Sequence, residues 1–194
     1  MAKLTGKKCL VTGGGRGIGR AIAVAFAKEG AAVAVIDRDA SALAATVDAL
    51  VGMNVTAMGT VGEVQDEASI TTAVRKSEAA LGGIDVLVNN AGIVSFAPVE
   101  TMSIEMWDEM IAVNLRSVFL CSKLVIPGMK SRRWGRIISL SSQLAHKGAK
   151  DVAHYCAAKA GIIGFTRALA REVIGFGIMS MPSAPVRLIP SLRK

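Results

Sequence analysis

The sequence predicts an α/β fold in which helices cover both faces of a parallel sheet, a three-layer, doubly wound arrangement. Short, continuous apolar runs that suit strands buried on both faces alternate with longer segments of helical periodicity. The chain has 194 residues, of which 52% are hydrophobic and 20% charged, and this suits one domain with a substantial core. No repeat, linker or low-complexity stretch divides it.

The expected elements follow one another in strict alternation. The first strand lies at 8–12, where KCLVT stops at a run of glycines, and a helix follows over 16–29 with Gly30 as its C-cap. The remaining strands are expected at 32–36, 55–58, 84–88 and 135–140, and the remaining helices at 40–50, 66–81, 103–129 and 154–173.

Composition excludes several other classes of protein. The three cysteines, Cys9, Cys121 and Cys156, are scattered and odd in number, which argues against a disulfide scaffold or a metal site and fits a reducing cytoplasm. No apolar run reaches the roughly 18 residues of a membrane span without interruption, so we expect no membrane partner. The net charge of +8 admits nucleic acid, but stacking aromatics and nucleic-acid motifs are lacking, so we expect none.

The first predicted strand runs into a glycine-rich loop, TGGGRGIG over 12–19, that precedes a helix. Glycines let the backbone approach a pyrophosphate, and the helix N-terminus offers free N–H groups and a positive dipole end. Asp37 ends the second strand, where a carboxylate binds both adenosine ribose hydroxyls and repels a 2′-phosphate. Arg16 or Arg38 could instead hold a 2′-phosphate, so the sequence favours NAD and leaves NADP as the alternative.

A second constellation consists of Ser142, Tyr155 and Lys159. The tyrosine and lysine lie four residues apart and share a helix face, so we expect the ammonium to lower the pKa of the phenol. Ser142 follows the fifth predicted strand and can donate a hydrogen bond to a substrate oxygen. A lone YxxxK is a common accident, but here it accompanies the glycine loop and the NNAG sequence at 89–92 after the fourth strand.

With these motifs the sequence resembles the short-chain dehydrogenase/reductase family, within it the subgroup of 3-oxoacyl-carrier-protein reductases and polyol or sugar dehydrogenases. The matching residues are TGxxxGxG at 12–19, NNAG at 89–92, Asn114 in the long helix, Ser142, and YxxxK at 155–159. The resemblance implies a Rossmann-type fold that transfers a hydride between a nicotinamide cofactor and a secondary alcohol or ketone. A catalytically silent nucleotide-binding or dimerising Rossmann module is the alternative.

The resemblance also implies roles for single residues. Tyr155 is expected to be the general acid/base, and Lys159 to lower its pKa and bind the nicotinamide ribose. Ser142 would orient the substrate oxygen, and Asn114 would hold a water that links Lys159 to solvent. His146 and His154 are assigned no catalytic role.

The same resemblance implies a cofactor site along the ends of the strands. The expected cofactor-binding residues are Gly13, Arg16, Gly17, Ile18, Gly19, Asp37, Arg38, Glu63, Val64, Asn90, Ala91, Gly92, Tyr155 and Lys159. Glu63 and Val64 stand where family members carry an aspartate and a hydrophobic residue. We expect substrate contacts from 94–96 and 143–150 and no metal; the substrate is a small alcohol or carbonyl compound.

The two late helices, 103–129 and 154–173, are apolar around more of their circumference than one sheet face requires. Deep burial within one subunit would explain this. The small residues of the second helix favour a subunit interface instead. We therefore expect a homo-dimer or homo-tetramer that forms through these helices.

After residue 178 the sequence departs from the family pattern. It reads MSMPSAPVRLIP over 179–190, and three prolines in nine residues do not suit an interior strand. We expect a dinucleotide-binding domain over 1–178, an aberrant tail over 179–194, and a sheet that lacks the last two family strands.

A truncation or frameshift would explain this departure. With permitted codons, a one-base shift of frame restores HVNAVCPGSTDT, which resembles the family segment; a divergent tail is the alternative. Without the last strands the nicotinamide would lose a wall and the substrate its lid. The adenosine half of the cofactor should then still bind, while turnover should be weak.

Overall fold

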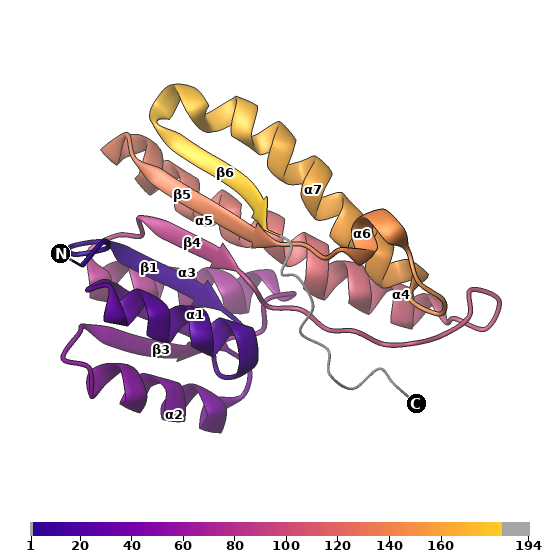
Figure 1. The fold of residues 1–194 in the computed structure, drawn as a ribbon, viewed down its shortest axis with the longest axis horizontal. Coiled ribbons are helices and arrows are strands. Elements are labelled where there is room, and N and C mark those ends of the chain that lie inside the picture. The colour runs from indigo at the N-terminus through magenta and orange to yellow at the C-terminus, as the bar shows by residue number, and fades with distance from the viewer. Residues whose placement is uncertain (1, 184–194) are drawn as a thin grey trace.

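The computed structural model describes residues 2–183 and shows one six-stranded sheet. Its strands are β1 (Lys8–Thr12), β2 (Ala32–Asp37), β3 (Ala57–Val61), β4 (Val86–Asn89), β5 (Gly135–Leu140) and β6 (Ile178–Ser183). They run in the order β3-β2-β1-β4-β5-β6, and every neighbouring pair is parallel (Figure 1). The order reverses between β1 and β4, and ligands of doubly wound sheets bind at this switch point. The predicted α/β, doubly wound fold is confirmed.

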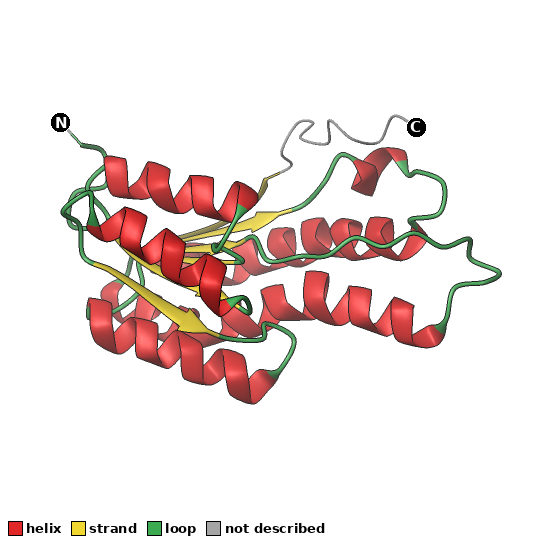
Figure 2. Ribbon diagram, turned by 90° about the horizontal axis from the view of Figure 1, so that it is seen from below, coloured by secondary structure: helices red, strands yellow, loops and turns green. Residues whose placement is uncertain are grey.

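Helices lie on both faces of the sheet (Figure 2). They are α1 (Gly17–Lys28), α2 (Ala40–Val51), α3 (Glu67–Leu81), α4 (Ile104–Ile111), the π-helical turn η1 (Ala112–Arg116), α5 (Ser117–Arg132), α6 (Leu144–Lys147), α7 (Ala153–Val173) and the 3₁₀ turn η2 (Ile174–Phe176). Helices α1 and α2 cover one face, and α3, α5 and α7 cover the other.

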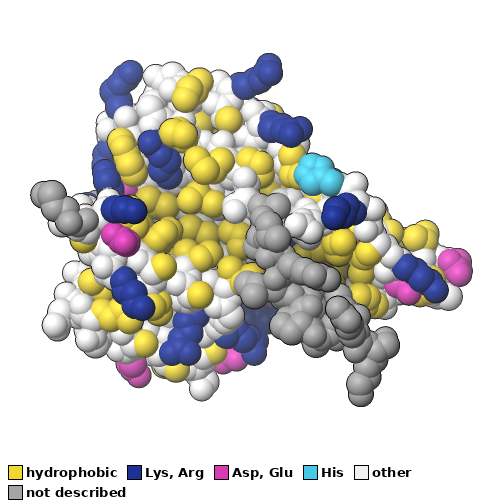
Figure 3. All heavy atoms as spheres, in the orientation of Figure 1, with side chains coloured by type: hydrophobic (Ala, Val, Ile, Leu, Met, Phe, Trp, Pro, Cys, Tyr) yellow, Lys and Arg dark blue, Asp and Glu magenta, His cyan; other side chains and the backbone are white. Residues whose placement is uncertain are grey.

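The core has two parts, one on each side of the sheet. The part beneath α3, α5 and α7 includes the buried side chains Ile70, Leu87, Val125, Ile137 and Leu169. The part beneath α1 and α2 includes the buried side chains Val11, Ala23, Val35, Leu43 and Val88. On this second face apolar side chains gather over the middle of the molecule (Figure 3), and Met179 and Met181 of β6 are exposed.

Local signals explain the helix starts that the sequence predicts. The side chains of Asp39, Asp66 and Ser103 accept hydrogen bonds from the backbone N–H groups of the first turns of α2, α3 and α4. At the other end of α3, Gly82 takes the left-handed conformation, with φ of 72°. Strand β3 starts two residues and ends three residues later than predicted, at Ala57–Val61.

The long predicted helix changes from α-helical to π-helical hydrogen bonding at its centre. One turn, η1, has π-helical hydrogen bonding and contains Asn114, and such turns are frequent at functional sites. By length and composition alone, the span Ile104–Arg132 is apolar enough to cross a bilayer, although Asn114, Pro127 and Gly128 interrupt it as the sequence predicted. Half of its most apolar window is buried inside the fold, as in a core helix, and α5 packs against α3, β4 and β5.

The expectation that the sheet ends at the fifth strand is wrong. Strand β6 pairs with β5 from Gly135↔Ile178 to Leu140↔Ser183. The carbonyl of Ser183 accepts a hydrogen bond from the N–H of Ser141 at 2.7 Å. Because successive residues of a strand direct their backbone groups to opposite sides, Pro182 places its nitrogen at the outer side, where no N–H is needed.

Strand β6 therefore continues across the expected boundary at residue 178. A seventh strand and the two later prolines fall outside the described residues. The division into a domain over 1–178 and an aberrant tail over 179–194, like its frameshift explanation, stays a prediction.

Candidate active site

The glycine loop turns sharply between β1 and α1. Gly13 has φ of 63°, and its N–H donates to the carbonyl of Ile36 at 2.7 Å, which joins the loop to β2. A Cβ at Gly19 would collide with the carbonyl of Gly13. The backbones of the loop and of the first turn of α1 are therefore in close contact, with no room for a side chain at Gly19.

A hydrogen-bond cluster joins this loop to the end of β4. The Asn90 amide Nδ2 donates to the carbonyls of Thr12 and Gly13, each at 2.9 Å. The Thr12 hydroxyl accepts from the N–H groups of Asn90 and Ala91 at 3.1 and 3.2 Å. Thr12 was part of the motif but not a predicted site residue. Its buried hydroxyl fixes the two strand ends that flank the switch point.

Asp37 lies at the end of β2 and is 8% exposed. Its Oδ2 accepts from the N–H of Gly15 at 2.8 Å, and its Oδ1 accepts from the N–H of Asp39 at 3.0 Å. A carboxylate oxygen has more than one lone pair, so both oxygens can still accept from a ligand. Arg16 lies 3.8 Å from the carboxylate of Asp39, in an exposed ion pair.

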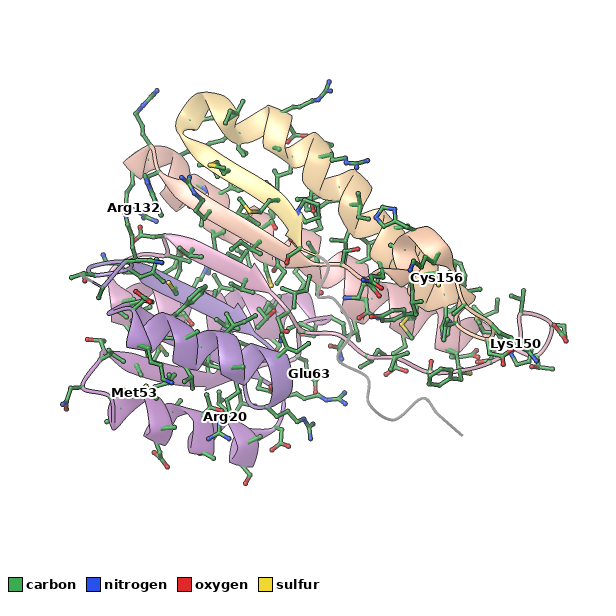
Figure 4. The ribbon with its side chains drawn as sticks, in the orientation of Figure 1. Arg20, Met53, Glu63, Arg132, Lys150 and Cys156 are labelled. Carbon is green, nitrogen blue, oxygen red and sulfur yellow. The ribbon has the colours of Figure 1, made fainter. Side chains whose placement is uncertain are left out.

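A cavity of about 330 Å³ opens at the carboxyl ends of the strands. Eleven of the fourteen predicted cofactor residues line it: Gly13, Arg16, Ile18, Gly19, Asp37, Arg38, Glu63, Val64, Asn90, Ala91 and Gly92. Figure 4 shows Glu63 in the loop after β3, at this end of the sheet. Its carboxylate accepts from the amide of Gln65 at 2.7 Å. Gly17, Tyr155 and Lys159 lie outside the cavity lining.

Four further lining residues were not predicted: Gly62, Gln65, Ile93 and Val113. They lie just beside predicted positions, in the β3–α3 loop, after NNAG and in the π-helical turn. Periodicity does not reveal loop residues of this kind, so the sequence held no signal for them beyond their neighbours.

Ser142, Tyr155 and Lys159 come together where β5 ends and α7 begins. The hydroxyl of Ser142 accepts from the N–H of Leu144 at 3.1 Å, which leaves its hydrogen available to donate. Lys159 is 5% exposed, and its Nζ donates to the carbonyl of Leu140 at 2.8 Å. The Lys159 Nζ lies 5.7 Å from the centroid of the Tyr155 ring.

The electrostatics of this group differ from the prediction. Burial raises the pKa of the Tyr155 phenol above its ordinary value, and a hydrogen bond with Ser142 opposes this increase. Burial lowers the pKa of Lys159 from 10.5 to about 8. The lowered pKa expected for Tyr155 is wrong for this structure, because desolvation of the phenol is the largest influence on its pKa.

Asn114 is fully buried and faces the loop after β4. Its Oδ1 accepts from the N–H of Ile93, and its Nδ2 donates to the carbonyl of Ile93, both at 3.0 Å. A Cβ at Gly92 would collide with Oδ1 of Asn114 and lie 3.6 Å from Nζ of Lys159. Gly92 thus lets the backbone pass between Asn114 and Lys159.

The two histidines differ in their surroundings. His146 lies on the short helix α6, within the stretch expected to contact substrate. His154 is fully buried, and its Nε2 lies 2.9 Å from the hydroxyl of Ser95. Sequence reasoning assigned neither histidine a role, and nothing in the pattern pointed to the pairing of Ser95 with His154.

These features fit a dinucleotide. The glycines leave a cradle that any side chain would fill, the helix N-terminus suits phosphates, and the buried Asp37 suits ribose hydroxyls. Beside the cavity, a tyrosine, a serine and a lysine supply a proton donor, a hydrogen-bond donor and a basic amine. The arrangement can protonate or deprotonate an oxygen attached to a carbon that exchanges a hydride.

Comparisons with known proteins agree with this geometry. A family profile described as short chain dehydrogenase matches residues 7–186. The 3-oxoacyl-acyl-carrier-protein reductase FabG of Escherichia coli (strain K12) is 44% identical over 180 residues, 93% of this chain and 72% of that protein. The 2-dehydro-3-deoxy-L-rhamnonate dehydrogenase (NAD(+)) of Sphingomonas sp. (strain SKA58) is 35% identical over 184 residues, 94% of this chain and 72% of that protein.

A solved structure, that of an NAD+-bound xylitol dehydrogenase, superimposes with a TM-score of 0.91 at 32% identity. The match covers 94% of this chain and 71% of that one.

Proposed function

Because this chain belongs to the short-chain dehydrogenase family, we propose that it oxidises a small secondary alcohol, or reduces the corresponding ketone, with NAD as the hydride partner. The observation that carries NAD is Asp37. Its buried carboxylate lines the cavity and is held by Gly15 and Asp39. A carboxylate in this position favours ribose hydroxyls and repels a 2′-phosphate.

NADP is the alternative. Arg16 and Arg38 line the same cavity, and a guanidinium can bind a 2′-phosphate through two hydrogen bonds. Arg16 is already paired with the carboxylate of Asp39, and this pairing weakens its attraction for such a phosphate. Two relatives favour NAD: one is named as an NAD(+) dehydrogenase, and one solved relative holds NAD+.

The residues of the chain act on the oxygen of the substrate. A bound nicotinamide ring supplies the carbon that accepts or donates the hydride. Tyr155, whose raised pKa keeps the phenol protonated at neutral pH, donates a proton to the oxygen of a ketone that is reduced. In the reverse direction the phenolate removes that proton from an alcohol. Ser142 donates a hydrogen bond to the same oxygen and holds it beside Tyr155.

Lys159 and Asn114 support this proton transfer. With its pKa lowered to about 8, the amine of Lys159 exchanges protons readily near neutral pH. We assign the proton route between Tyr155 and solvent to Lys159 and Asn114, which lie close to each other on either side of Gly92. Lys159 would also hold the nicotinamide ribose, and Gly13 with the first turn of α1 would hold the pyrophosphate.

We also propose that the chain forms a homo-dimer or homo-tetramer through α4, α5 and α7. Large apolar side chains are exposed on α4, Ile104 by 70% and Trp107 by 40%, and on α5, Phe119 by 45%. Clusters of exposed apolar side chains on helices support a subunit interface.

The experiment that tests the function is a turnover screen. Secondary alcohols, including polyols, sugar acids and 3-hydroxyacyl thioesters, are offered with NAD and then with NADP, while reduced cofactor is followed by absorbance. We expect turnover with NAD that exceeds turnover with NADP. Cofactor binding by calorimetry without turnover on any substrate would instead support a catalytically silent nucleotide-binding module.

A further inference from the structure

Two hydrogen bonds join the loop after β4 to the start of the catalytic helix. The hydroxyl of Ser95 lies 2.9 Å from Nε2 of His154, and the N–H of Ala97 donates to the carbonyl of Asp151 at 2.9 Å. The first bond ends on the residue directly before Tyr155. The loop 90–103 carries the exposed apolar side chains Val94 and Phe96, expected to contact substrate.

The start of α7 has little local support of its own. Its N-cap, Val152, provides no side-chain hydrogen bond, so the usual capping contact is lacking. Asp151, directly before it, has φ of 61°, a left-handed conformation that non-glycine residues adopt rarely. The carbonyl that accepts from Ala97 belongs to this residue, so the loop contact holds the chain in a conformation that is unfavourable by itself.

His154 is buried without full satisfaction of its polar atoms. The ring is fully buried, and its Nδ1 has no hydrogen-bond partner among residues 2–183. Burial lowers the pKa of the ring, so His154 is neutral at pH 7 and keeps a single directed contact, the one with Ser95. Buried side-chain nitrogens usually have hydrogen-bond partners. Because the partner of His154 among residues 2–183 is Ser95 of the substrate loop, this hydrogen bond serves to position the loop.

We infer that Ser95 and His154 form a brace that sets the distance between the substrate loop and Tyr155, and that they are positioning residues for the substrate. The inference rests on the proposed function, because it takes the loop 90–103 as a wall of the substrate site. Removing either partner should leave the cofactor cavity intact, since neither residue lines it. The alcohol should then bind less tightly beside a catalytic group that is itself unchanged.

The test compares four variants with the parent enzyme. Ser95→Ala and His154→Leu should each raise the KM for the alcohol about fivefold, the value of one neutral hydrogen bond, with kcat within about twofold. The Kd for NAD should not change. His154→Gln, whose amide can reach Ser95, should restore the parent KM. Thr101→Ala is the matched control, because its hydroxyl contacts only Pro98 within the same loop.

Coupling between the two residues decides the result. The double variant Ser95→Ala/His154→Leu should resemble either single variant, with KM raised about fivefold, because the bond can be lost only once. Independent effects, which would raise KM about 25-fold, would overturn the inference. So would an unchanged KM in Ser95→Ala, which alters a half-buried loop residue and should fold.

A second readout needs no turnover. Without cofactor, the backbone amide of Ala97 should exchange with solvent at least about fivefold faster in Ser95→Ala than in Thr101→Ala or in the parent. Equal exchange rates would overturn the brace. If the parent proves inactive on every substrate, the proposed function fails, while the exchange rates still judge the contact between Ser95 and His154.

Discussion

The carboxylate of Asp37 accepts a hydrogen bond from the N–H of Gly15 at 2.8 Å, which joins the acid at the end of β2 to the glycine loop after β1. A Cβ at Gly15 would lie 2.9 Å from the same carboxylate oxygen. The residue that we propose selects the cofactor is therefore held by the loop that we propose binds its phosphates. Loss of the charge at Asp37 should alter both cofactor choice and the position of the loop.

Asp37→Asn should reduce the preference for NAD over NADP. Hydrogen bonds to a charged group contribute about 1.5–3 kcal/mol, so the Kd for NAD should rise about 10- to 100-fold. The Kd for NADP should fall or stay constant, because the repulsion of a 2′-phosphate is removed. Calorimetric titrations with both cofactors provide the measurement. Asp48→Asn, on the exposed side of α2, is the control, and an unchanged ratio of the two affinities would contradict the role of Asp37.

Gly19→Ala should abolish NAD binding. The new methyl group would collide with the carbonyl of Gly13 and would lie 2.5 Å from Nδ2 of Asn90, and neither can move without displacing the loop. We expect at least about a 100-fold loss of affinity by calorimetry, because the loop must open. Gly175→Ala, where a Cβ meets nothing within 4 Å, should bind NAD as the parent does. Tight binding by Gly19→Ala would show that the loop does not hold the cofactor.

Lys159→Met should stabilise the protein at pH 7 and not at high pH. The pKa of Lys159 is lowered from 10.5 to about 8, so below pH 8 the folded protein holds a buried charge. That charge costs about 3 kcal/mol, offset by about 1 kcal/mol from the bond to Leu140. From pH 8 to 10.5 the folded state releases this proton before the unfolded state does, so the cost disappears as pH rises.

Urea unfolding of the parent and of Lys159→Met, at several pH values from 7 to 10, measures this difference. The variant should be more stable by about 2 kcal/mol at pH 7, and the difference should shrink toward zero as the pH approaches 10. A difference that does not vary with pH would mean that Lys159 has an ordinary pKa in the folded protein.

Phe119→Lys should dissociate the proposed oligomer. Phe119 is exposed on α5, packs edge-on against Phe165 of α7 with ring centroids 6.4 Å apart, and so lies where the two helices meet. A charge there would be costly to bury between subunits. Sedimentation analysis should give the mass of a single chain for Phe119→Lys and that of two or four chains for Val51→Lys, whose site on α2 is also exposed. Equal masses for both variants would place the interface elsewhere.

The sequence predicts most of this molecule because its signals are local. The run KCLVT ends at glycines and is β1, residue for residue, and Gly82 marks the end of α3. The cofactor residues lie at strand ends, so the order of the strands brings them into one cavity. In a doubly wound sheet, the point where the strand order reverses is enough to locate such a site.

Long-range contacts account for what the sequence did not predict. Pro182 argued against a strand, but β6 is the last strand of the sheet formed by residues 2–183, and the nitrogen of Pro182 lies on its outer side. The pKa of Tyr155 is raised chiefly by burial, and the ammonium of Lys159 donates to the carbonyl of Leu140; neither follows from a spacing of four residues. The contact of Ser95 with His154 joins residues 59 positions apart, beyond the reach of any local pattern.

The most direct test of the account compares the parent with Tyr155→Phe at saturating NAD on the best secondary alcohol from the turnover screen. Tyr155 is the only tyrosine of the chain, and phenylalanine keeps its ring while removing the proton-transferring hydroxyl. The account predicts that kcat falls at least about 100-fold, a typical contribution of general acid–base catalysis, while the Kd for NAD stays within about twofold. Turnover by Tyr155→Phe at the rate of the parent would contradict it.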